Sequence, residues 1–547
     1  MEHASDSEVP GPRTDAAFVG LVAACSVALH VSGLGFYSDD WDLLSVFRFS
    51  ADQSIGGLYR ALAPEAQMAM RPGQKLLDVL LYRNFGLDPL GYHLFNAAVL
   101  IANGVLFLLV LRELGISRRL SAAAAIIYSL LPHYSTDRVW YASIQAPFSV
   151  TMYLLSLVAG LRSLEGGAGR AWSWRLLSLA SLAASTLAYE VALPLFVLNA
   201  WLLWSETRRR GAGTRASLAT RVFVGLTAIG PIAAAGFKAV TTTRLSRGPS
   251  LGYVTAAARQ LAWINLWVYG VAAPRTVWIA LRHASALTLG AAGILAVAIY
   301  AIVRRLPSSP NDGLPGSHRW FRLIGAGVGV FLLGYVVFLS TTSGFSATGP
   351  NNRTAIVGAL GIALVFVGAA GWISDRLPPS WRDRGFAGLV AACGTGGFVA
   401  NAMLLTSWVT AYRQQEAILA TIHQSLATIP QRTTVILDGV CPYVGPAIVF
   451  ESGWDLQGAL RLLYRDTTLQ ADVVTPNLRV EHDGLHAVLY GEDSRYPYQR
   501  LLLFNVRGPS SDSIPNDEAA RAYFARVNPD RSNGCPPGRA GHGVRVF

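Results

Sequence analysis

The feature that most constrains this chain is a series of apolar blocks, each close to 20 residues long and almost free of ionisable groups. A helix needs about 20 apolar residues to cross the roughly 30 Å of hydrocarbon in a bilayer. Of the 547 residues, 52% are hydrophobic and only 14% are charged, which excludes a string of soluble domains. The sequence therefore predicts a polytopic α-helical membrane protein.

The expected spans follow from the limits of these blocks. They run over 17–35, 93–111, 120–137, 145–161, 222–241, 285–303, 323–341, 354–373 and 387–408. The stretch 176–205 is longer and is interrupted by Glu190 and Pro194. It fits either one tilted helix or a hairpin of two short spans.

The distribution of basic residues favours the hairpin. With two spans there, one set of loops holds 18 arginines in 70 residues, and the opposite set holds 12 lysines or arginines in 127. Basic residues are enriched in cytoplasmic loops, whereas a single span would place Arg208, Arg209 and Arg210 outside. We therefore expect about eleven spans in the plasma (inner) membrane of a bacterium, with a cytoplasmic N-terminus. The first block lacks a basic leader and a small-residue cleavage site, so it is interpreted as a retained helix.

The excess of basic residues is explained by this topology. Lysine and arginine together number 45 against 33 acidic residues, but the basic residues stand at the ends of apolar blocks. A nucleic-acid binder would gather them on a soluble face. The sequence therefore predicts a bilayer as a partner and no nucleic acid.

The character of the chain changes near Thr410. Short strand-like runs follow (TTVILDG, AIVFESG, GLHAVLYG and QRLLLFNVR), with a helical stretch near Asp517–Val527. We expect a transmembrane domain over 1–408 and an extracytoplasmic soluble domain over 409–547, of α/β or α+β class. Cys441 and Cys535 are the two cysteines of the second domain, and we expect a disulfide between them in an oxidising compartment. The long segment 242–284 suits helices that lie in the membrane interface.

Acidic residues gather directly after the first block. The segment FYSDDWDLL places Asp39, Asp40 and Asp42 at the outer membrane surface. Desolvation and mutual repulsion raise the pKa of at least one carboxyl in such a cluster, which suits general-base chemistry. The alternative is a solvated helix start, in which Ser38 or Asp39 is the N-cap.

Several basic residues are expected on the same outer side. Arg71 and Lys75 precede the second block, and Arg138 and Arg353 stand where later helices begin. Arginine grips a phosphate through two donors, but ordinary interfacial snorkelling explains such residues equally well. His93 is either a buried structural histidine or a substrate contact.

The order of these motifs is more specific than any one of them. A helix, an outer loop that opens with an acidic pair, the tripeptide MRP, and GYHLFN leading into a helix resemble the GT-C membrane glycosyltransferases. The branch that contains protein O-mannosyltransferase-like and aminoarabinose-transferase-like enzymes is the most similar. Motif similarity is best over 36–163, the loop pattern extends it to about 408, and no motif covers 410–547.

The resemblance implies a function and a site. Asp39 and Asp40 match the catalytic acid pair of the family, although many relatives have Asp-Glu there, which leaves open which carboxylate acts. The family moves a sugar, here a hexose or a pentose, from a polyprenyl-phosphate donor to a hydroxyl of a glycan, lipid or protein. Transfer occurs on the extracytoplasmic face with inversion, and Arg71, Lys75, His93, Arg138 and Arg353 are the expected substrate-binding residues. The sequence requires no cofactor and does not identify a metal site, although a divalent cation is compatible with the carboxylates.

Two functions from other classes compete with this one. A transporter or lipid flippase usually places ionisable residues at the bilayer midplane, but here Glu190 and Lys238 stand toward the outer side. A non-catalytic scaffold that binds glycan would keep the spans without needing Asp39 and Asp40.

Overall fold

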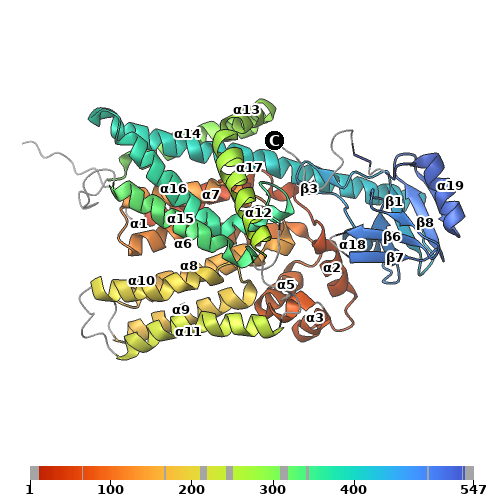
Figure 1. Ribbon diagram of the computed structural model, residues 1–547, viewed down its shortest axis with the longest axis horizontal. Coiled ribbons are helices and arrows are strands. Elements are labelled where there is room, and N and C mark those ends of the chain that lie inside the picture. The colour runs from red at the N-terminus through yellow and green to blue at the C-terminus, as the bar shows by residue number, and fades with distance from the viewer. Residues whose placement is uncertain are drawn as a thin grey trace, which may run out of the picture.

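The computed structural model describes residues 12–64, 66–165, 168–209, 218–241, 250–307, 318–339, 344–489, 492–531 and 534–535. Figure 1 shows an elongated molecule in which a bundle of long helices lies at one end and a domain with strands lies at the other. The fold class is therefore the expected one: an α-helical bundle followed by a C-terminal domain that contains a sheet.

The bundle helices occupy the expected apolar blocks. They are α1 (Pro12–Ala28), α6 (Pro89–Glu113), α7 (Arg118–Leu130), α8 (Gln145–Arg162), α9 (Ala168–Ala188), α10 (Phe196–Arg209), α11 (Leu218–Thr241), α14 (Ala286–Arg305), α15 (His318–Leu339), α16 (Ile356–Ser374) and α17 (Pro379–Ser425). Within the described residues, eight helices are long and apolar enough to cross a membrane. The helices α7, α9 and α10 are not among them, so the count of about eleven spans stays a prediction.

The stretch 176–205 forms two helices. Helix α9 ends at Ala188, a short 3-10 turn η5 follows at Leu193–Leu195, and α10 begins at Phe196. Proline lacks the backbone N–H that an α-helix uses, and Pro194 stands in this turn. Glu190, just before the turn, lies 3.2 Å from Nζ of Lys238, near the end of α11. The stretch is thus broken into two helices, as the hairpin interpretation predicts. The residues Arg210 and Arg215 of the next loop lie outside the described part of the chain.

One expected span is shorter than its block. The apolar stretch 120–137 gives a helix only as far as Leu130. Pro132 follows, and the chain continues in the 3-10 turns η2 (Pro132–Tyr134), η3 (Thr136–Arg138) and η4 (Tyr141–Ser143). The span is therefore shorter than expected, and residues 131–144 form a buried loop at one end of the bundle.

Short helices fill the two long segments between spans. The first segment holds α2 (Asp39–Phe49), α3 (Ile55–Ala61), α4 (Ala66–Ala69) and α5 (Pro72–Phe85). In Figure 1, α2, α3 and α5 lie at the end of the bundle nearest the C-terminal domain. The second segment is helical, as expected, with α12 (Leu251–Ala262), a π-helical stretch η6 (Trp263–Val271) and α13 (Ala273–His283). A last 3-10 segment, η7 (Pro350–Ala355), leads into α16.

Helix α17 joins the bundle to the C-terminal domain without a break. It is 47 residues long and passes through the expected domain boundary at residue 408. Its bundle half packs closely on α7, because a Cβ added at Gly397 would meet the carbonyl oxygen of Leu130 at 2.4 Å. Its other half buries Gln415, whose Nε2 donates to the carbonyl of Val449 at 2.7 Å. The boundary at 408 stays a prediction, and the first strand begins only at Thr434.

The C-terminal domain is built on a four-stranded sheet with the order β4-β1-β8-β9. Strand β1 (Thr434–Asp438) is parallel to β4 (Gln470–Val473) and to β8 (Leu501–Asn505), while β9 (Ser510–Ile514) is antiparallel to β8. Helices α18 (Gly453–Tyr464) and α19 (Asp517–Val527) pack on it, and two small antiparallel sheets flank it: β2 (Tyr443–Val444) with β3 (Ala447–Ile448), and β5 (Arg479–Val480) with β6 (Leu485–Leu489) and β7 (Glu492–Tyr496).

The strand predictions hold in part. The runs TTVILDG, GLHAVLYG and QRLLLFNVR contain β1, β6 and β8, and the helical stretch coincides with α19. The run AIVFESG pairs only at Ala447–Ile448. Its end turns instead to cap α18, since the backbone N–H of Glu451 donates to the Asp455 carboxylate at 2.7 Å.

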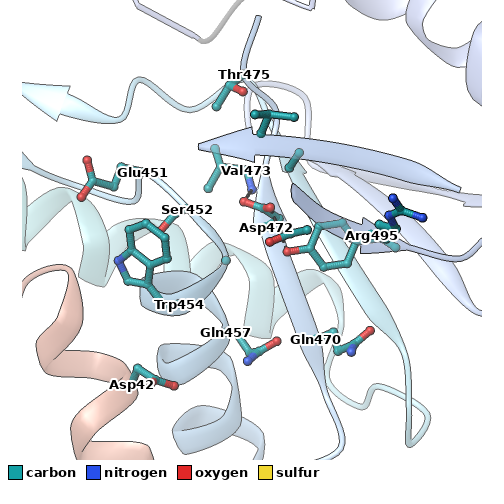
Figure 2. A pocket seen from close by; sticks show the side chains of 15 residues that line it. Asp42, Glu451, Ser452, Trp454, Gln457, Gln470, Asp472, Val473, Thr475 and Arg495 are labelled. Carbon is teal, nitrogen blue, oxygen red and sulfur yellow. Dashed lines mark hydrogen bonds between the residues drawn. The ribbon is translucent and has the colours of Figure 1, made fainter. Parts of the chain in front are cut away.

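The C-terminal domain docks directly on α2. Helix α18 lies against α2 so closely that a Cβ at Gly458 would meet the backbone of Trp41 at 2.4 Å. Beside this contact, a cavity of about 400 Å³ opens between Asp42 of α2 and the residues of α18, β4 and β7. Figure 2 shows Trp454 on one side of this cavity and Arg495 on the other.

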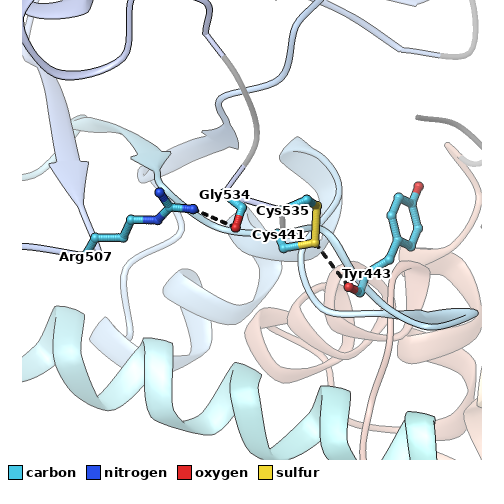
Figure 3. The surroundings of a disulfide bond; sticks show 5 residues. All are labelled: Cys441, Tyr443, Arg507, Gly534 and Cys535. Atoms are coloured by element: carbon cyan, nitrogen blue, oxygen red, sulfur yellow. Dashed lines mark hydrogen bonds between the residues drawn. A yellow bond between two sulfur atoms is a disulfide. The ribbon is translucent and has the colours of Figure 1, made fainter. Parts of the chain in front are cut away.

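The expected disulfide is present. Cys441 and Cys535 are bonded, with their Cα atoms 4.4 Å apart and 94 residues between them in the chain. Figure 3 shows the neighbouring contact in which Arg507 donates to the carbonyl of Gly534 at 2.7 Å. The bond closes the C-terminal segment onto the loop that follows β1.

Replacement of both cysteines, Cys441→Ser with Cys535→Ser, is expected to destabilise the C-terminal domain. Closure of a loop of 94 residues restricts the unfolded chain, and loss of a native disulfide typically costs about 2–4 kcal/mol. Thermal unfolding of the detergent-solubilised protein measures the change. Cys393→Ala is the matched control, because Cys393 is a free and exposed cysteine. Equal melting of the double variant and the control would contradict a stabilising role for the bond.

Candidate active site

The segment before α2 is held by hydrogen bonds to α17 and to the 131–144 loop. The hydroxyl of Tyr37 donates to the carbonyl of Trp408 in α17 at 2.9 Å, and the two rings meet edge to face at 4.7 Å. The indole N–H of Trp140 donates to the carbonyl of Tyr37 at 3.0 Å. Residues from the first outer loop, the 131–144 loop and α17 therefore meet at one point.

Asp40 links two of these loops through its carboxyl group. One oxygen accepts the backbone N–H of Tyr37 at 2.8 Å, and the other accepts that of Ala142 at 2.8 Å. The side chain is fully buried. Burial, and less strongly the charges of Asp39 and Asp78, raise the pKa of Asp40 well above its usual value, although the two backbone donors oppose this. Both oxygens of Asp40 are thus engaged by the fold.

Asp39 differs from Asp40 in being accessible. Its side chain is exposed to solvent, yet enough protein surrounds it that desolvation raises its pKa. The positive charge of Arg353 acts in the opposite direction. Of the two neighbouring acids, Asp39 is therefore the one whose carboxylate a substrate can reach.

The residue before Asp39 is held in a strained conformation. Ser38 has φ +47° and ψ −121°, a region that non-glycine residues rarely adopt. Two side chains of the C-terminal domain hold its hydroxyl: the indole N–H of Trp454 donates to it at 3.2 Å, and it donates to Glu451 at 3.1 Å. The C-terminal domain therefore helps to set the position of Asp39.

Arg353 provides a cation beside Asp39. Its guanidinium lies over the ring of Trp140, 4.8 Å from the centroid, and within the described residues no hydrogen bond or ion pair occupies it. Asn352 fixes the segment, because it donates to the carbonyl of His133 and accepts from Ser135 at 3.0 Å. Arg353 is thus presented at the site with its donors available.

Asp137 is a second acid near Arg353. Its carboxyl is fully buried, and burial raises its pKa well above the usual value, while the charge of Arg353 and a nearby hydroxyl of Ser143 oppose this. The charge of Arg353 thus acts on an accessible carboxylate, that of Asp39, and on a buried one, that of Asp137.

Arg71 belongs to a buried ion cluster. Its guanidinium pairs with Glu190 and lies over the ring of Tyr189, 4.4 Å from the centroid. Lys238 completes the cluster, with Nζ 3.2 Å from Glu190 and 2.9 Å from the carbonyl of Met70. Burial alone would raise the pKa of Glu190, but the charges and hydrogen bonds of Arg71 and Lys238 outweigh it and lower that pKa to about 2.

Lys75 and His93 occupy different settings. Lys75 is buried on α5, one turn after Arg71, and its ammonium lies 4.2 Å from the ring centroid of Tyr59. Burial lowers its pKa. His93 is buried on α6, and its Nε2 lies 2.9 Å from the carbonyl oxygen of Gly35, which favours the structural interpretation of this histidine.

Arg138 is buried, and protein groups accept hydrogen bonds from its guanidinium. Its guanidinium donates to Ser26 at 2.7 Å and to the carbonyls of Ser129 and Leu131 at 3.0 and 3.1 Å. Only 2% of the residue is exposed. Arg138 thus satisfies carbonyls at the end of α7, and substrate binding by this residue stays a prediction.

Several charged residues of this region were not singled out as site residues from sequence. Asp137 adjoins Arg138, and Asp78 lies two turns after Arg71 on α5, where the Tyr141 hydroxyl reaches it at 3.4 Å. Burial raises the pKa of Asp78 to about 7. Both aspartates lie in loops that the sequence predicts on the outer side, and this shared location could have identified them as candidates. The residues that contact them come from distant segments of the chain, so the spacing of residues in the sequence could not predict these contacts.

A metal site is not evident in the geometry. Among the described residues, no group of three or more histidine, cysteine, aspartate or glutamate side chains could hold an ion. A cation held jointly by Asp39 and a donor phosphate would not need such a group, so the cation remains an expectation.

The fold and this site define a polytopic membrane protein with a cluster of charged residues at one end of its helix bundle. Two solved structures are similar in fold. The crystal structure of ArnT from Cupriavidus metallidurans bound to undecaprenyl phosphate has 17% sequence identity and a TM-score of 0.36, with 83% of this chain and 84% of that chain covered. The same protein in the apo state has 16% identity and a TM-score of 0.36, with 82% and 84% covered. No protein-family model matches the sequence, and no curated protein sequence matches it.

Replacement Glu190→Gln is expected to destabilise the bundle. The change leaves Arg71 and Lys238 buried without a counter-charge, and a buried pair broken in this way costs about 3–5 kcal/mol. Thermal unfolding in detergent measures it, with Glu113→Gln as control, because the partner of Glu113, Arg162, is 35% exposed.

The same cluster predicts a pH dependence. The folded pKa of Glu190 is lowered from 4.5 to about 2, so its contribution to stability is complete above 4.5 and is lost as pH falls toward 2. The difference in melting temperature between wild type and Glu190→Gln should therefore shrink below pH 4.5. A difference that is constant down to the lowest accessible pH would contradict the assignment.

Proposed function

We propose that this protein is a membrane glycosyltransferase that moves a sugar from a polyprenyl-phosphate donor to an acceptor hydroxyl on the extracytoplasmic face. The observation that carries the proposal is an accessible carboxylate, Asp39, under the positive charge of Arg353. Among the described residues, no hydrogen bond or ion pair occupies the guanidinium of Arg353. Both lie at the end of an apolar bundle, where a lipid-borne sugar and a hydrophilic acceptor can meet. The motif order around Asp39 and Asp40, which resembles the GT-C enzymes, supports the same function.

The reaction assigns a role to each group. Asp39 in its ionised form accepts the proton of the acceptor hydroxyl as that oxygen attacks the anomeric carbon. The bond from this carbon to the phosphate oxygen breaks on the opposite face, which inverts the configuration and releases the polyprenyl phosphate. Arg353 stabilises the charge on the departing phosphate, and Lys75 is the second candidate cation. Arg71 is neutralised by Glu190 and holds the fold around the site.

The proposal includes a location. The catalytic domain over 1–408 spans the plasma membrane, its N-terminus is cytoplasmic, and the domain over 409–547 is extracytoplasmic. The disulfide between Cys441 and Cys535 supports an oxidising compartment for the second domain.

The rival functions gain no specific observation. A transporter needs ionisable groups that a substrate or a coupling ion can reach, whereas Glu190, Arg71 and Lys238 saturate one another in a buried cluster. A scaffold without catalysis leaves unexplained why a strained Ser38 is maintained before an accessible Asp39.

Replacement Asp39→Asn is expected to lower sugar transfer by about 10²–10⁴-fold with little change in melting temperature, because it removes a general base and keeps the shape. Asp40→Asn should act in the opposite way and lower stability, since an amide cannot accept both the Tyr37 and Ala142 N–H groups. Transfer from a labelled polyprenyl-phosphate sugar in vesicles, with Asp52→Asn as the surface control, measures both. Full activity of Asp39→Asn would refute its role as base.

The pH profile and Arg353 refine the same experiment. Because burial raises the pKa of Asp39 above 3.8, the base is lost by protonation as pH falls through that raised value. The acid limb of kcat/KM should therefore lie above the ordinary aspartate range of about 4.

Replacement Arg353→Gln should raise the donor KM and lower kcat while folding is kept. An unchanged donor KM and kcat in this variant would remove Arg353 from the phosphate site.

Reporter fusions test the proposed topology. A fusion after Phe547 is expected to be active outside the cytoplasm, and one in the 208–215 loop inside, because the arginine-rich loops are predicted to be cytoplasmic. Alkaline phosphatase and a cytoplasmic fluorescent reporter at each position provide reciprocal signals. Both fusions on one side would contradict the orientation.

A further inference from the structure

The cavity between α2 and the C-terminal domain is a feature that the proposed chemistry does not use. Its volume is about 400 Å³, within the range of small-molecule sites. Its walls come from α2, α18, β4, β6 and β7 and the loops beside them: Asp42, Glu451, Ser452, Gly453, Trp454, Gln457, Gln470, Asp472, Val473, Thr475, Ala487, Val488, Ser494, Arg495 and Tyr496. Two segments far apart in the sequence thus build one cavity.

The lining has the chemistry of a hydroxyl-rich ligand site. Trp454 provides an aromatic surface, and carboxyl, amide and hydroxyl groups surround it, as Figure 2 shows for Glu451, Gln457 and Asp472. A sugar presents apolar C–H faces, which pack on an aromatic ring, and hydroxyls, which need donors and acceptors in fixed places. Few other metabolites need both at once.

The carboxylate of Asp472, in the lining of the cavity, is oriented by two hydrogen bonds. It is 5% exposed, one oxygen accepts the N–H of Val473 at 2.7 Å, and the other accepts the Tyr496 hydroxyl at 2.8 Å. Each carboxylate oxygen can accept a second bond, so both keep acceptor capacity for a ligand hydroxyl. Such a fixed, buried acceptor is a binding group whose geometry is set before the ligand arrives.

The charge of the cavity restricts the ligand. Three carboxyl groups, Asp42, Glu451 and Asp472, line it against one guanidinium, that of Arg495. A negative lining repels phosphorylated, sulfated or uronic sugars. It accepts an uncharged sugar, whose hydroxyls donate to the carboxylates.

The cavity shares a wall with the candidate active site. Trp454 and Glu451, which line the cavity, both bind the hydroxyl of Ser38, the residue before Asp39. A ligand against Trp454 therefore lies on the side of Asp39 that faces the C-terminal domain. The lipid-borne donor would approach from the bilayer instead.

We propose that this cavity is the acceptor subsite and that it binds an uncharged carbohydrate. The proposal rests on the glycosyltransferase function and narrows its acceptor to a glycan, or to the glycan part of a glycolipid or glycoprotein. Asp472 and Gln457 bind hydroxyls of this sugar, and Trp454 packs against one of its faces.

Equilibrium binding to the full-length protein in nanodiscs tests the subsite without any turnover. The probes are neutral glucose-, galactose-, mannose- and arabinose-terminated oligosaccharides, with a phosphorylated hexose for comparison, and saturation-transfer NMR with titration measures them. At least one neutral probe should bind saturably, and the phosphorylated one should not. Gln457→Ala and Asp472→Asn should each weaken binding by about tenfold, the effect of one or two lost hydrogen bonds. Gln431→Ala, an exposed glutamine away from the cavity, should leave the affinity unchanged.

The outcomes separate this proposal from the proposed function. Absence of saturable binding by every neutral probe overturns the subsite, as does binding that Gln457→Ala and Asp472→Asn leave intact while their melting temperatures match wild type. Binding that persists in a protein whose transfer activity is absent keeps the sugar site and overturns the transferase function. Where transfer is measured, the two variants should raise the acceptor KM and leave the donor KM unchanged, and a change in the donor KM instead would contradict an acceptor subsite.

Discussion

The buried carboxyl of Asp40 is the interaction on which the site depends. It receives one backbone N–H from the segment before α2 and one from the 131–144 loop, so two segments separated by about a hundred residues share a single carboxyl group. A buried carboxyl group that lost one of these donors would carry an unsatisfied acceptor, which the fold cannot tolerate cheaply. The neighbouring Asp39 can remain accessible because Asp40 bears the structural role. Two adjacent acids of the same type thereby acquire different functions from their surroundings alone.

The sequence predicted what depends on local composition. Bilayer thickness fixes the length of an apolar block, so the positions of the helices followed from the blocks, and Pro194 marked the turn between α9 and α10. The limits failed where the expected span ran past a helix-ending signal: the span was extended to residue 137, yet Pro132 and the polar residues after it end the helix at Leu130. Similarly, the β-branched run AIVFESG resembled a strand, but its final residues cap α18.

The parts of the site that escaped sequence reasoning are those made by tertiary contact. Arg71 looked like a phosphate-binding residue because its partner, Glu190, lies more than a hundred residues away. Arg138 looked equally available, although it serves carbonyls at the end of α7. Arg353 remains a candidate for binding the phosphate, because it packs on Trp140 and within the described residues no acid forms an ion pair with it. Trp454 and Glu451 of the C-terminal domain bind Ser38, and no sequence motif predicted this contact.

The unbroken course of α17 has a mechanical consequence. An α-helix rises about 1.5 Å per residue, so the 47 residues of α17 form a rod of about 70 Å that starts within the bundle and ends beneath the sheet. Such a rod has no loop at which the bundle and the sheet could hinge, and α18 contacts both α17 and α2. The separation between the bundle and the sheet is therefore fixed by the length of one helix.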